Sequence, residues 1–143
     1  MVDSTTLAPG CTRPAAPAGL LAPIDAAHRR SIRLHVERHL GDPALTPSSV
    51  AAAHALSLRY VHRLWAQEAA DTLGRHILRR RLERCRADLA DPRQAGRTVT
   101  DIALRWGFRS PAHFSRAYRA HFGAAPREHR QAALGQDGPA LPA

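Results

Sequence analysis

Lysine is missing from this sequence. All 21 basic residues are arginines, and aromatic residues make up only 5% of the 143 residues. An aromatic-rich core is therefore excluded, and we expect a core built mainly from leucine, isoleucine, valine and alanine. Hydrophobic residues reach 44%, which is enough for a real core in one domain or in a pair of very small ones.

Cysteine and long apolar runs are scarce as well. The two cysteines, Cys11 and Cys85, are too few for a disulfide framework, so we expect a reducing environment. No apolar run approaches the ~20 residues needed to cross a bilayer. The N-terminus lacks the charged start and continuous apolar block of a secretory signal. We therefore expect a cytoplasmic protein with no membrane partner.

Acidic residues are the minority among the charged ones. With 12 of them against 21 arginines, the formal net charge is +9 with histidine neutral. This charge predicts attraction to a polyanion such as nucleic acid or an acidic membrane surface. Arginine binds phosphates and guanine edges through its planar fork, but codon usage in a GC-rich genome also raises the arginine count. The positions of particular arginines are therefore more informative than their total.

Regular patterns are confined to the middle of the chain. Residues 1–23 mix proline, glycine, alanine and threonine without periodicity, and residues 131–143 look the same, so both are expected to be disordered tails. Between them, residues 24–130 show helical periodicity, and no run alternates as a strand would. We predict one all-α domain over residues 24–130.

Capping residues and prolines indicate where the helices begin and end. The first helix is expected from about Asp25 to Leu40, and a long helix from about Thr72 to Ala90, where Pro92 follows. Apolar residues at helical spacing predict the buried faces. These are Ile32, Val36 and Leu40 in the first helix; Leu58, Val61, Leu64 and Trp65 after Ser57; Leu73, Ile77, Leu82, Cys85 and Leu89 in the long helix; and Ile102, Ala103, Trp106, Phe114 and Tyr118 further on.

An internal repeat contains a cap, a short apolar helix, a tight turn, a second cap and an arginine-bearing helix. Residues 46–51, TPSSVA, match residues 98–103, TVTDIA, at an offset of 52. Beyond the turn the offset becomes 53, because Arg109 is inserted. The matched pairs there are Ser57 with Ser110, Arg63 with Arg116, and Trp65 with Tyr118.

Local signals in the second copy of the repeat support the same division into helices. Thr98 and Asp101 form a T-x-x-D variant of the capping box. Gly107 supplies the positive φ with which a helix often ends. Ser110 then caps a further helix that Gly123 ends. We therefore interpret each copy as a helix-turn-helix unit.

Two such units in one chain predict a particular way of binding DNA. In a helix-turn-helix unit the second helix enters the major groove, which is about 12 Å wide and accepts one α-helix. The long helix between the units, at about 1.5 Å per residue, is a rod of roughly 30 Å. Successive major-groove openings on one face of DNA are ~34 Å apart. We therefore expect one chain to place two recognition helices in consecutive grooves as a monomer.

The chain resembles the DNA-binding domain of the AraC/XylS family of bacterial transcription regulators. The likeness is carried by VTDIALRWGFRSPAHFSRAYRAHFGAAPREHR at residues 99–130 and by the less regular LTPSSVAAAHALSLRYVHRLW at residues 45–65. It covers about residues 30–130. It implies seven helices, two helix-turn-helix units joined by a linker helix, and binding to promoter DNA that usually recruits RNA polymerase. Ala55 stands where the first unit often has glycine, and no ligand-binding domain is expected ahead of the DNA-binding region.

The family's recognition helices indicate which residues should contact DNA. Arg63 and Arg116 are the strongest candidates, because the repeat places them equivalently and arginine to guanine is the commonest specific contact. The alternative is that both are solvated helix arginines. Pro111 and Ala112 offer no side-chain hydrogen bonds, so the second helix is expected to make a methyl contact or to bind phosphates alone. The full expected set is Ser57, Arg59, His62, Arg63, Arg109, Ser110, Ala112, His113, Arg116 and Arg119.

Metal binding and catalysis have little support in the sequence. His35 and His39 are four residues apart on one helix and could share a metal, but no third ligand is implied, so a polar helix face is the preferred interpretation. Cys85 lies on an apolar stripe and is interpreted as a small core residue. No catalytic triad, carboxylate pair or phosphate loop stands out. We expect no enzyme activity, no cofactor and no bound metal.

Three functions remain open at this point. The first is a sequence-specific transcription regulator, expected to be an activator. The second is a non-specific architectural nucleic-acid binder, which the net charge alone would support. The third is a metal-sensing or partner-binding module that uses the histidines.

Overall fold

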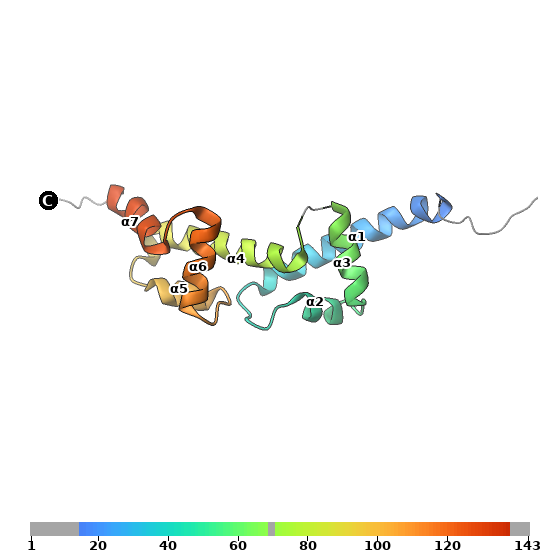
Figure 1. The fold of residues 1–143 in the computed structure, drawn as a ribbon, viewed down its shortest axis with the longest axis horizontal. Helices are drawn as coiled ribbons and strands as arrows, with labels where there is room; N and C mark the ends of the chain where they lie inside the picture. Colours follow the sequence, from blue (N-terminus) through green and yellow to red (C-terminus); the bar gives the residue numbers. More distant parts are fainter. Residues whose placement is uncertain (1–14, 69–70, 138–143) are drawn as a thin grey trace, which may run out of the picture. The chain divides into compact units, whose positions relative to one another are not determined.

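The computed structural model describes residues 15–68 and 71–137, and within these ranges the protein is helical and contains no strand (Figure 1). This confirms the expected all-α fold. The α-helices are α1 (Ala15–His39), α2 (Pro47–Ala53), α3 (Leu58–Glu68), α4 (Leu73–Ala90), α5 (Val99–Arg105), α6 (Pro111–Phe122) and α7 (Pro126–Asp137), and a short 3-10 helix, η2 (Pro92–Gln94), follows α4.

The chain divides into two compact parts, residues 1–34 and residues 35–143. The described residues of the first part are the larger share of α1. Among them Ile32 is buried, whereas Ile24 and Leu34 are half exposed. The second part contains the end of α1 and all the other helices, so both helix-turn-helix units belong to it.

Helices α1 and α7 are longer than expected. The first begins at Ala15, ten residues before Asp25, and the last continues to Asp137 instead of ending near Arg130. Segments 15–23 and 131–137 were expected to be irregular because of their proline and glycine content. Both are rich in alanine, leucine and glutamine, which have high helix propensity, and this preference dominates. The remaining parts of the expected tails, residues 1–14 and 138–143, lie outside the described residues, as does Cys11.

Helix α4 has the boundaries and the buried stripe that the sequence predicts. The Thr72 side chain caps its first turn by accepting from the Arg75 amide, and the chain leaves the helix at Asp91. Its 18 residues give a rod of about 27 Å at 1.5 Å per residue. The predicted inward-facing residues are buried: Leu73, Ile77, Leu82, Cys85 and Leu89.

The core of the second helix-turn-helix unit forms on the C-terminal half of α4. Leu82, Cys85 and Leu89 from α4 meet residues of α5, α6 and the turn between them. The aromatic rings pack in a row, with centroids 4.9 Å apart for Phe108–Phe114 and 5.6 Å apart for Phe114–Tyr118. The Tyr118 hydroxyl lies 2.6 Å from His129 Nδ1 and so connects this core to α7.

The first helix-turn-helix unit has a smaller core. Val50 and Ala51 of α2 are buried, as are Val61, Leu64 and Trp65 of α3. This unit meets the linker helix where the Trp65 ring lies 4.9 Å from the His76 ring.

Two residues expected in the core are more exposed than predicted. Leu58 is 38% exposed, because a helical side chain covers the turn before it and Leu58 has no earlier turn of α3 to cover. Trp106 is half-buried, and its indole nitrogen donates to Asp88 at 2.8 Å, which draws it towards the polar surface.

Ion pairs join the end of α1 to α4, both within residues 35–143. Glu37 accepts from Arg80 at 2.7 Å and from Arg84 at 2.9 Å, and Arg80 also pairs with Glu83. The hydrogen bond from Arg80 is the largest of the effects that lower the pKa of Glu37 to about 2. The carboxylate is therefore charged at neutral pH.

Candidate nucleic-acid interface

The two turns of the repeat contain an equivalent backbone hydrogen bond. In the first, the Leu56 amide donates to the Ala51 carbonyl at 2.9 Å; in the second, the Phe108 amide donates to the Ala103 carbonyl at 3.1 Å. These donors and acceptors differ by the 52 residues that separate the two copies in the sequence. The repeat is therefore a structural one, with two equivalent turns between the paired helices.

Short-range hydrogen bonds set the start of each helix in the repeat. Thr46 and Ser49 form a capping box at α2, and Thr98 and Asp101 form the predicted one at α5. The two arginine-bearing helices also start at the predicted caps. The Ser57 hydroxyl accepts from the Tyr60 amide at 3.1 Å, and the Ser110 hydroxyl accepts from the His113 amide at 3.2 Å.

Both turns require a left-handed backbone residue at the same place. Gly107 takes this conformation in the second unit, with φ +92°, as predicted. In the first unit Ala55 takes it with φ 55°, and among the described residues it is the one non-glycine residue with positive φ. The departure of Ala55 from the family's glycine therefore leaves the turn intact but strained, since left-handed backbone costs an L-residue roughly 1–2 kcal/mol.

We predict that Ala55→Gly raises the free energy of unfolding by about 1 kcal/mol, because relief of that strain exceeds the added entropy of glycine in the unfolded chain. Ala52→Gly is the matched control. Ala52 is exposed and helical, so the same chemical change should lower the free energy of unfolding by about 1 kcal/mol. Urea unfolding measures both, and a loss of stability in both variants would show that the turn is not strained.

The structure exposes the whole of the expected DNA-contacting set on α3, α6 and the residues just before each of them. The opposite sides of these helices are committed to the core through Leu64 and Trp65 in α3 and through Phe114 and Tyr118 in α6. The exposed residues are Ser57, Arg59, His62, Arg63, Arg109, Ser110, Ala112, His113, Arg116 and Arg119.

The two equivalent arginines differ in their surroundings. The Arg63 guanidinium lies 5.1 Å from the centroid of the Tyr60 ring, and both line a shallow hollow with Ser57 and Arg59. Arg116 has no side-chain partner among the described residues. The Tyr60 ring therefore restricts Arg63 before any ligand binds, while Arg116 is held only by its place on α6.

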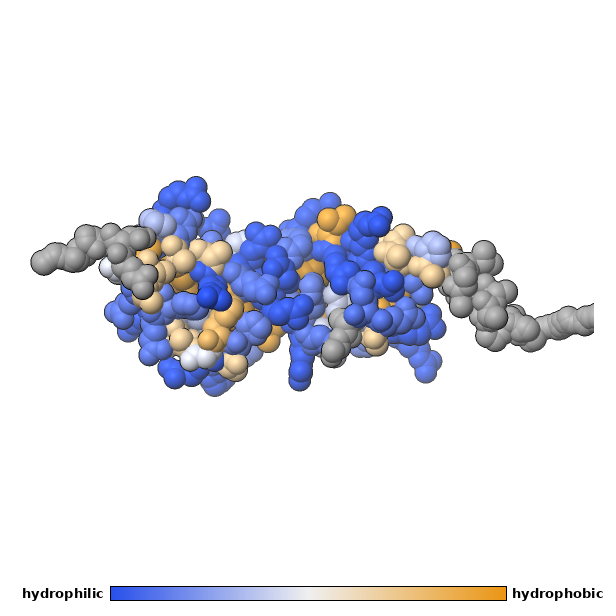
Figure 2. Space-filling view, turned by 90° about the horizontal axis from the view of Figure 1, so that it is seen from above, coloured by the Kyte–Doolittle hydropathy of each residue, from blue (hydrophilic) through white to orange (hydrophobic). Residues whose placement is uncertain are grey.

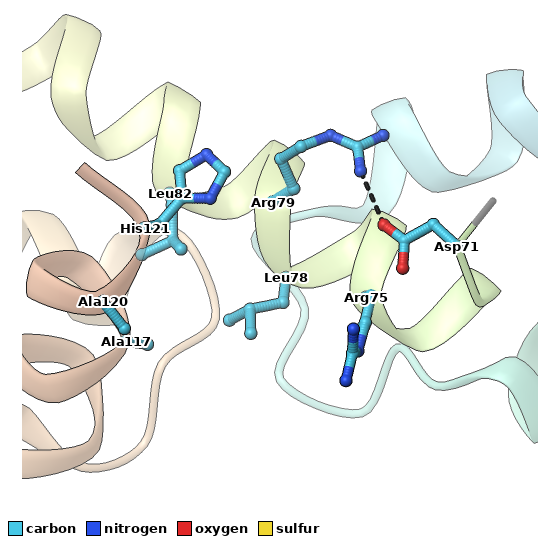
Figure 3. A pocket seen from close by; sticks show the side chains of 8 residues that line it. All are labelled: Asp71, Arg75, Leu78, Arg79, Leu82, Ala117, Ala120 and His121. Atoms are coloured by element: carbon cyan, nitrogen blue, oxygen red, sulfur yellow. Dashed lines mark hydrogen bonds and ion pairs between the residues drawn. The ribbon is translucent and has the colours of Figure 1, made fainter. Parts of the chain in front are cut away.

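Arg75 is a basic residue beside α6 that the sequence reasoning did not single out. It lines a hollow of about 560 Å³ between α4 and α6, together with Leu78, Arg79 and His121 (Figure 3). Arg79 is paired there with Asp71 at 2.8 Å. The Arg75 side chain is exposed and has no partner among the described residues. The sequence did contain a signal for this exposure. Arg75 is two residues from the buried Leu73, and positions two apart in a helix lie on roughly opposite sides.

Hydrophilic residues cover most of the face seen in Figure 2, and apolar residues form only small separate areas on it. No helix in the described part of the chain is both long enough and apolar enough to span a membrane.

The histidines near the end of α1 lie against one another. The His35 ring is 4.2 Å from the His39 ring and 5.1 Å from the His54 ring, and burial, followed by the charges of these neighbours, lowers the pKa of His35. The structure contains, among residues 15–68 and 71–137, no group of three or more side chains arranged to hold a metal. These rings therefore form a packed polar cluster.

Cys85 is the core residue that its position on the stripe of α4 predicts. It is buried and unpaired, and burial raises the pKa of its thiol to about 12. Because the thiolate is the reactive form, Cys85 is poorly suited to redox sensing in the folded protein.

The fold and its paired, arginine-bearing helices define a DNA-binding domain made of two helix-turn-helix units. A family described as a helix-turn-helix domain matches residues 50–132. The transcriptional activator NphR of a Rhodococcus species is 36% identical over 96 residues, which are 67% of this chain and 28% of NphR. The HTH-type transcriptional activator RhaS of Escherichia coli is 39% identical over 103 residues, which are 72% of this chain and 34% of RhaS.

A solved structure supports the same assignment. The C-terminal domain of AraT, a response regulator from Geobacillus stearothermophilus, superposes with a TM-score of 0.68 at 26% identity, over 78% of this chain and 87% of that one. The chain belongs to the AraC family of helix-turn-helix transcription regulators, which confirms the resemblance seen in its sequence. It spans about a third of the length of the two curated relatives.

Proposed function

We propose that this protein is a sequence-specific transcription activator that inserts α3 and α6 into consecutive major grooves of promoter DNA. The observation that carries the proposal is the equivalence of the two units: the same turn, followed by a helix with an exposed arginine at the matching position. Two relatives that match this chain are named as transcriptional activators, which supports the direction of regulation.

The exposed residues fall into two groups: those that suit contacts with base edges and those that suit contacts with phosphates. Arg63 and Arg116 lie on the outer faces of their helices, where a guanidinium can bind a guanine edge in a bidentate manner. Arg59 and His62 extend the first reading surface. On α6, Ala112 offers only a methyl group, which suits contact with thymine.

The remaining residues suit contacts with the DNA backbone. Ser57 and Ser110 stand at helix N-termini, where phosphates bind favourably. The phosphate-binding set on the second unit is completed by Arg109, His113 and Arg119, and Arg75 adds a cation on the adjoining face of α4.

The partners that follow are double-stranded promoter DNA and RNA polymerase, in the cytoplasm, with one protein molecule per site. No enzyme activity or cofactor belongs to this function. Non-specific architectural binding is the competing proposal, favoured by the net charge of +9 and by the lack of side-chain donors at the start of α6. Competition between a site selected from random DNA and scrambled DNA separates the two: an architectural binder shows no preference at fixed salt.

We predict that one chain occupies an asymmetric site of about two helical turns, because each chain already carries two recognition helices. The site is first obtained by selection from a random DNA pool. Sedimentation of the complex on the minimal selected site then gives the stoichiometry. Two protein molecules on that minimal site would contradict the single-chain arrangement.

A further inference from the structure

The loop between α1 and α2 lies directly against the turn of the second helix-turn-helix unit. A Cβ atom added to Gly107 would lie 2.7 Å from the Leu40 carbonyl oxygen, and one added to Gly41 would lie 2.8 Å from the Arg105 carbonyl oxygen. Both separations are shorter than real Cβ contacts allow. Two glycines, one on each side, therefore permit the loop and the turn to approach this closely.

Arg81 of α4 closes this contact. Its Nε donates to the Leu40 carbonyl at 2.9 Å, and its Nη2 donates to the Asp42 carbonyl at 2.7 Å. The added Cβ on Gly107 would also lie 2.8 Å from Arg81 Nε, so the guanidinium touches the turn as well as the loop. Loop, linker helix and turn meet at this one half-buried side chain, and we call this contact the Arg81 joint.

The joint connects elements that belong to different helix-turn-helix units. The loop that Arg81 holds leads within a few residues to Thr46, which caps the first helix of the first unit. Within the loop, the Asp42 carboxylate accepts from the Ala44 amide at 2.9 Å, and the Leu45 amide donates to the Asp42 carbonyl at 3.0 Å. The segment between the carbonyls that Arg81 holds and the cap of α2 is therefore ordered by hydrogen bonds of its own.

We propose that Arg81 is a positioning residue. Each helix-turn-helix unit binds one short DNA segment, which we call a box, and Arg81 fixes the spacing between the two boxes that the protein accepts. Its donors go to loop carbonyls, so it acts by fixing one unit against the other. The proposal rests on the proposed two-groove function. One inserted base pair moves the second box by about 3.4 Å and turns it by about 34°, so a joint that holds the units rigidly makes the protein reject that DNA.

The test uses the selected site and versions of it with one base pair inserted or deleted between the boxes. For the wild-type protein we expect each change to weaken binding about tenfold or more, because one unit must leave its box. For Arg81→Ala we expect the penalty to fall below about threefold while the base preference inside each box stays. Arg81→Lys keeps a charged donor group but only one nitrogen, which cannot reproduce the fork that reaches both carbonyls, and it should restore part of the penalty.

Two controls keep loss of charge and loss of folding apart from loss of the joint. Arg86→Ala removes another arginine of α4, which contacts the Phe122 ring, and should leave the spacing penalty unchanged. Gly41→Ala keeps Arg81 but forces the loop away from the Arg105 carbonyl. It should therefore also reduce the loss of affinity that an inserted or deleted base pair causes. Gly96→Ala is its matched control, since a Cβ there meets nothing within 4 Å.

The outcomes are distinguishable. If the wild-type protein shows no preference for the selected site over scrambled DNA, the proposed two-groove function fails. If it prefers the selected site but binds all three spacings equally, the units are not held rigidly and the positioning role of Arg81 is overturned. If the wild-type penalty is present but remains in both Arg81→Ala and Gly41→Ala, the positioning role of Arg81 is overturned. Circular dichroism and thermal melting of each variant establish that it is folded; should Arg81→Ala not fold, Gly41→Ala decides.

Discussion

Arg79→Pro should lower the free energy of unfolding by about 3 kcal/mol or more relative to Arg79→Ala, because proline removes a backbone donor and clashes with the preceding turn inside α4. Arg79 lies in the half of α4 nearer the first helix-turn-helix unit. Its side chain makes a partly exposed ion pair with Asp71 and also lies 3.0 Å from His76 Nδ1. Arg79→Ala loses that same pair at a cost of about 0–1 kcal/mol. The difference between the two variants therefore reports the backbone of the linker helix alone.

The same two variants test whether an intact α4 is needed to hold the two recognition helices at the spacing of consecutive major grooves. In conditions where Arg79→Pro remains folded, we expect its affinity for the two-box site to fall towards its affinity for a single box, whereas Arg79→Ala keeps the two-box advantage. Titration of both DNAs by fluorescence anisotropy measures this. An Arg79→Pro protein that is folded and keeps the wild-type two-box advantage would show that α4 does not set the spacing.

Arg63→Ala and Arg116→Ala should each weaken binding to the selected site by about 1–3 kcal/mol and relax the preference at one or two base pairs. The physical reason is the loss of a bidentate contact from an exposed guanidinium on the groove-facing side of its helix. We expect the larger loss of specificity from Arg63. Arg59 and His62 stand beside it, and the Tyr60 ring already restricts its guanidinium, whereas α6 begins with Pro111 and Ala112.

Salt dependence separates base reading from phosphate anchoring in these two variants. An arginine that contacts only phosphate weakens binding to all sequences alike, and its loss lowers the salt slope by about one. Arg75→Ala is the matched comparison, since we assign Arg75 to the backbone. Affinities on selected and scrambled DNA at two salt concentrations give the result, and equal losses on both DNAs would reduce Arg63 and Arg116 to electrostatic anchors.

The sequence by itself determined the features that depend on neighbours within a few residues. Thr98 and Asp101 are three residues apart, so their capping box could be read directly, and Gly107 marked the turn in the same way. The stripe of α4 followed from helical periodicity alone. The equivalence of Arg63 and Arg116 followed from the repeat, because two copies of one local pattern fold into two copies of one local structure.

Only the tertiary structure decided the features that depend on contacts between distant parts of the chain. Arg81 and Leu40 are 41 residues apart, and no local pattern distinguishes Arg81 from its neighbours Arg79 and Arg80. The half-exposed position of Trp106 likewise depends on Asp88, 18 residues earlier in α4, to which its indole nitrogen donates. Helical periodicity identifies which side of a helix is apolar, but which carbonyl a side chain reaches is fixed only when separate helices pack, and so the joint between the two units could not be predicted from the sequence.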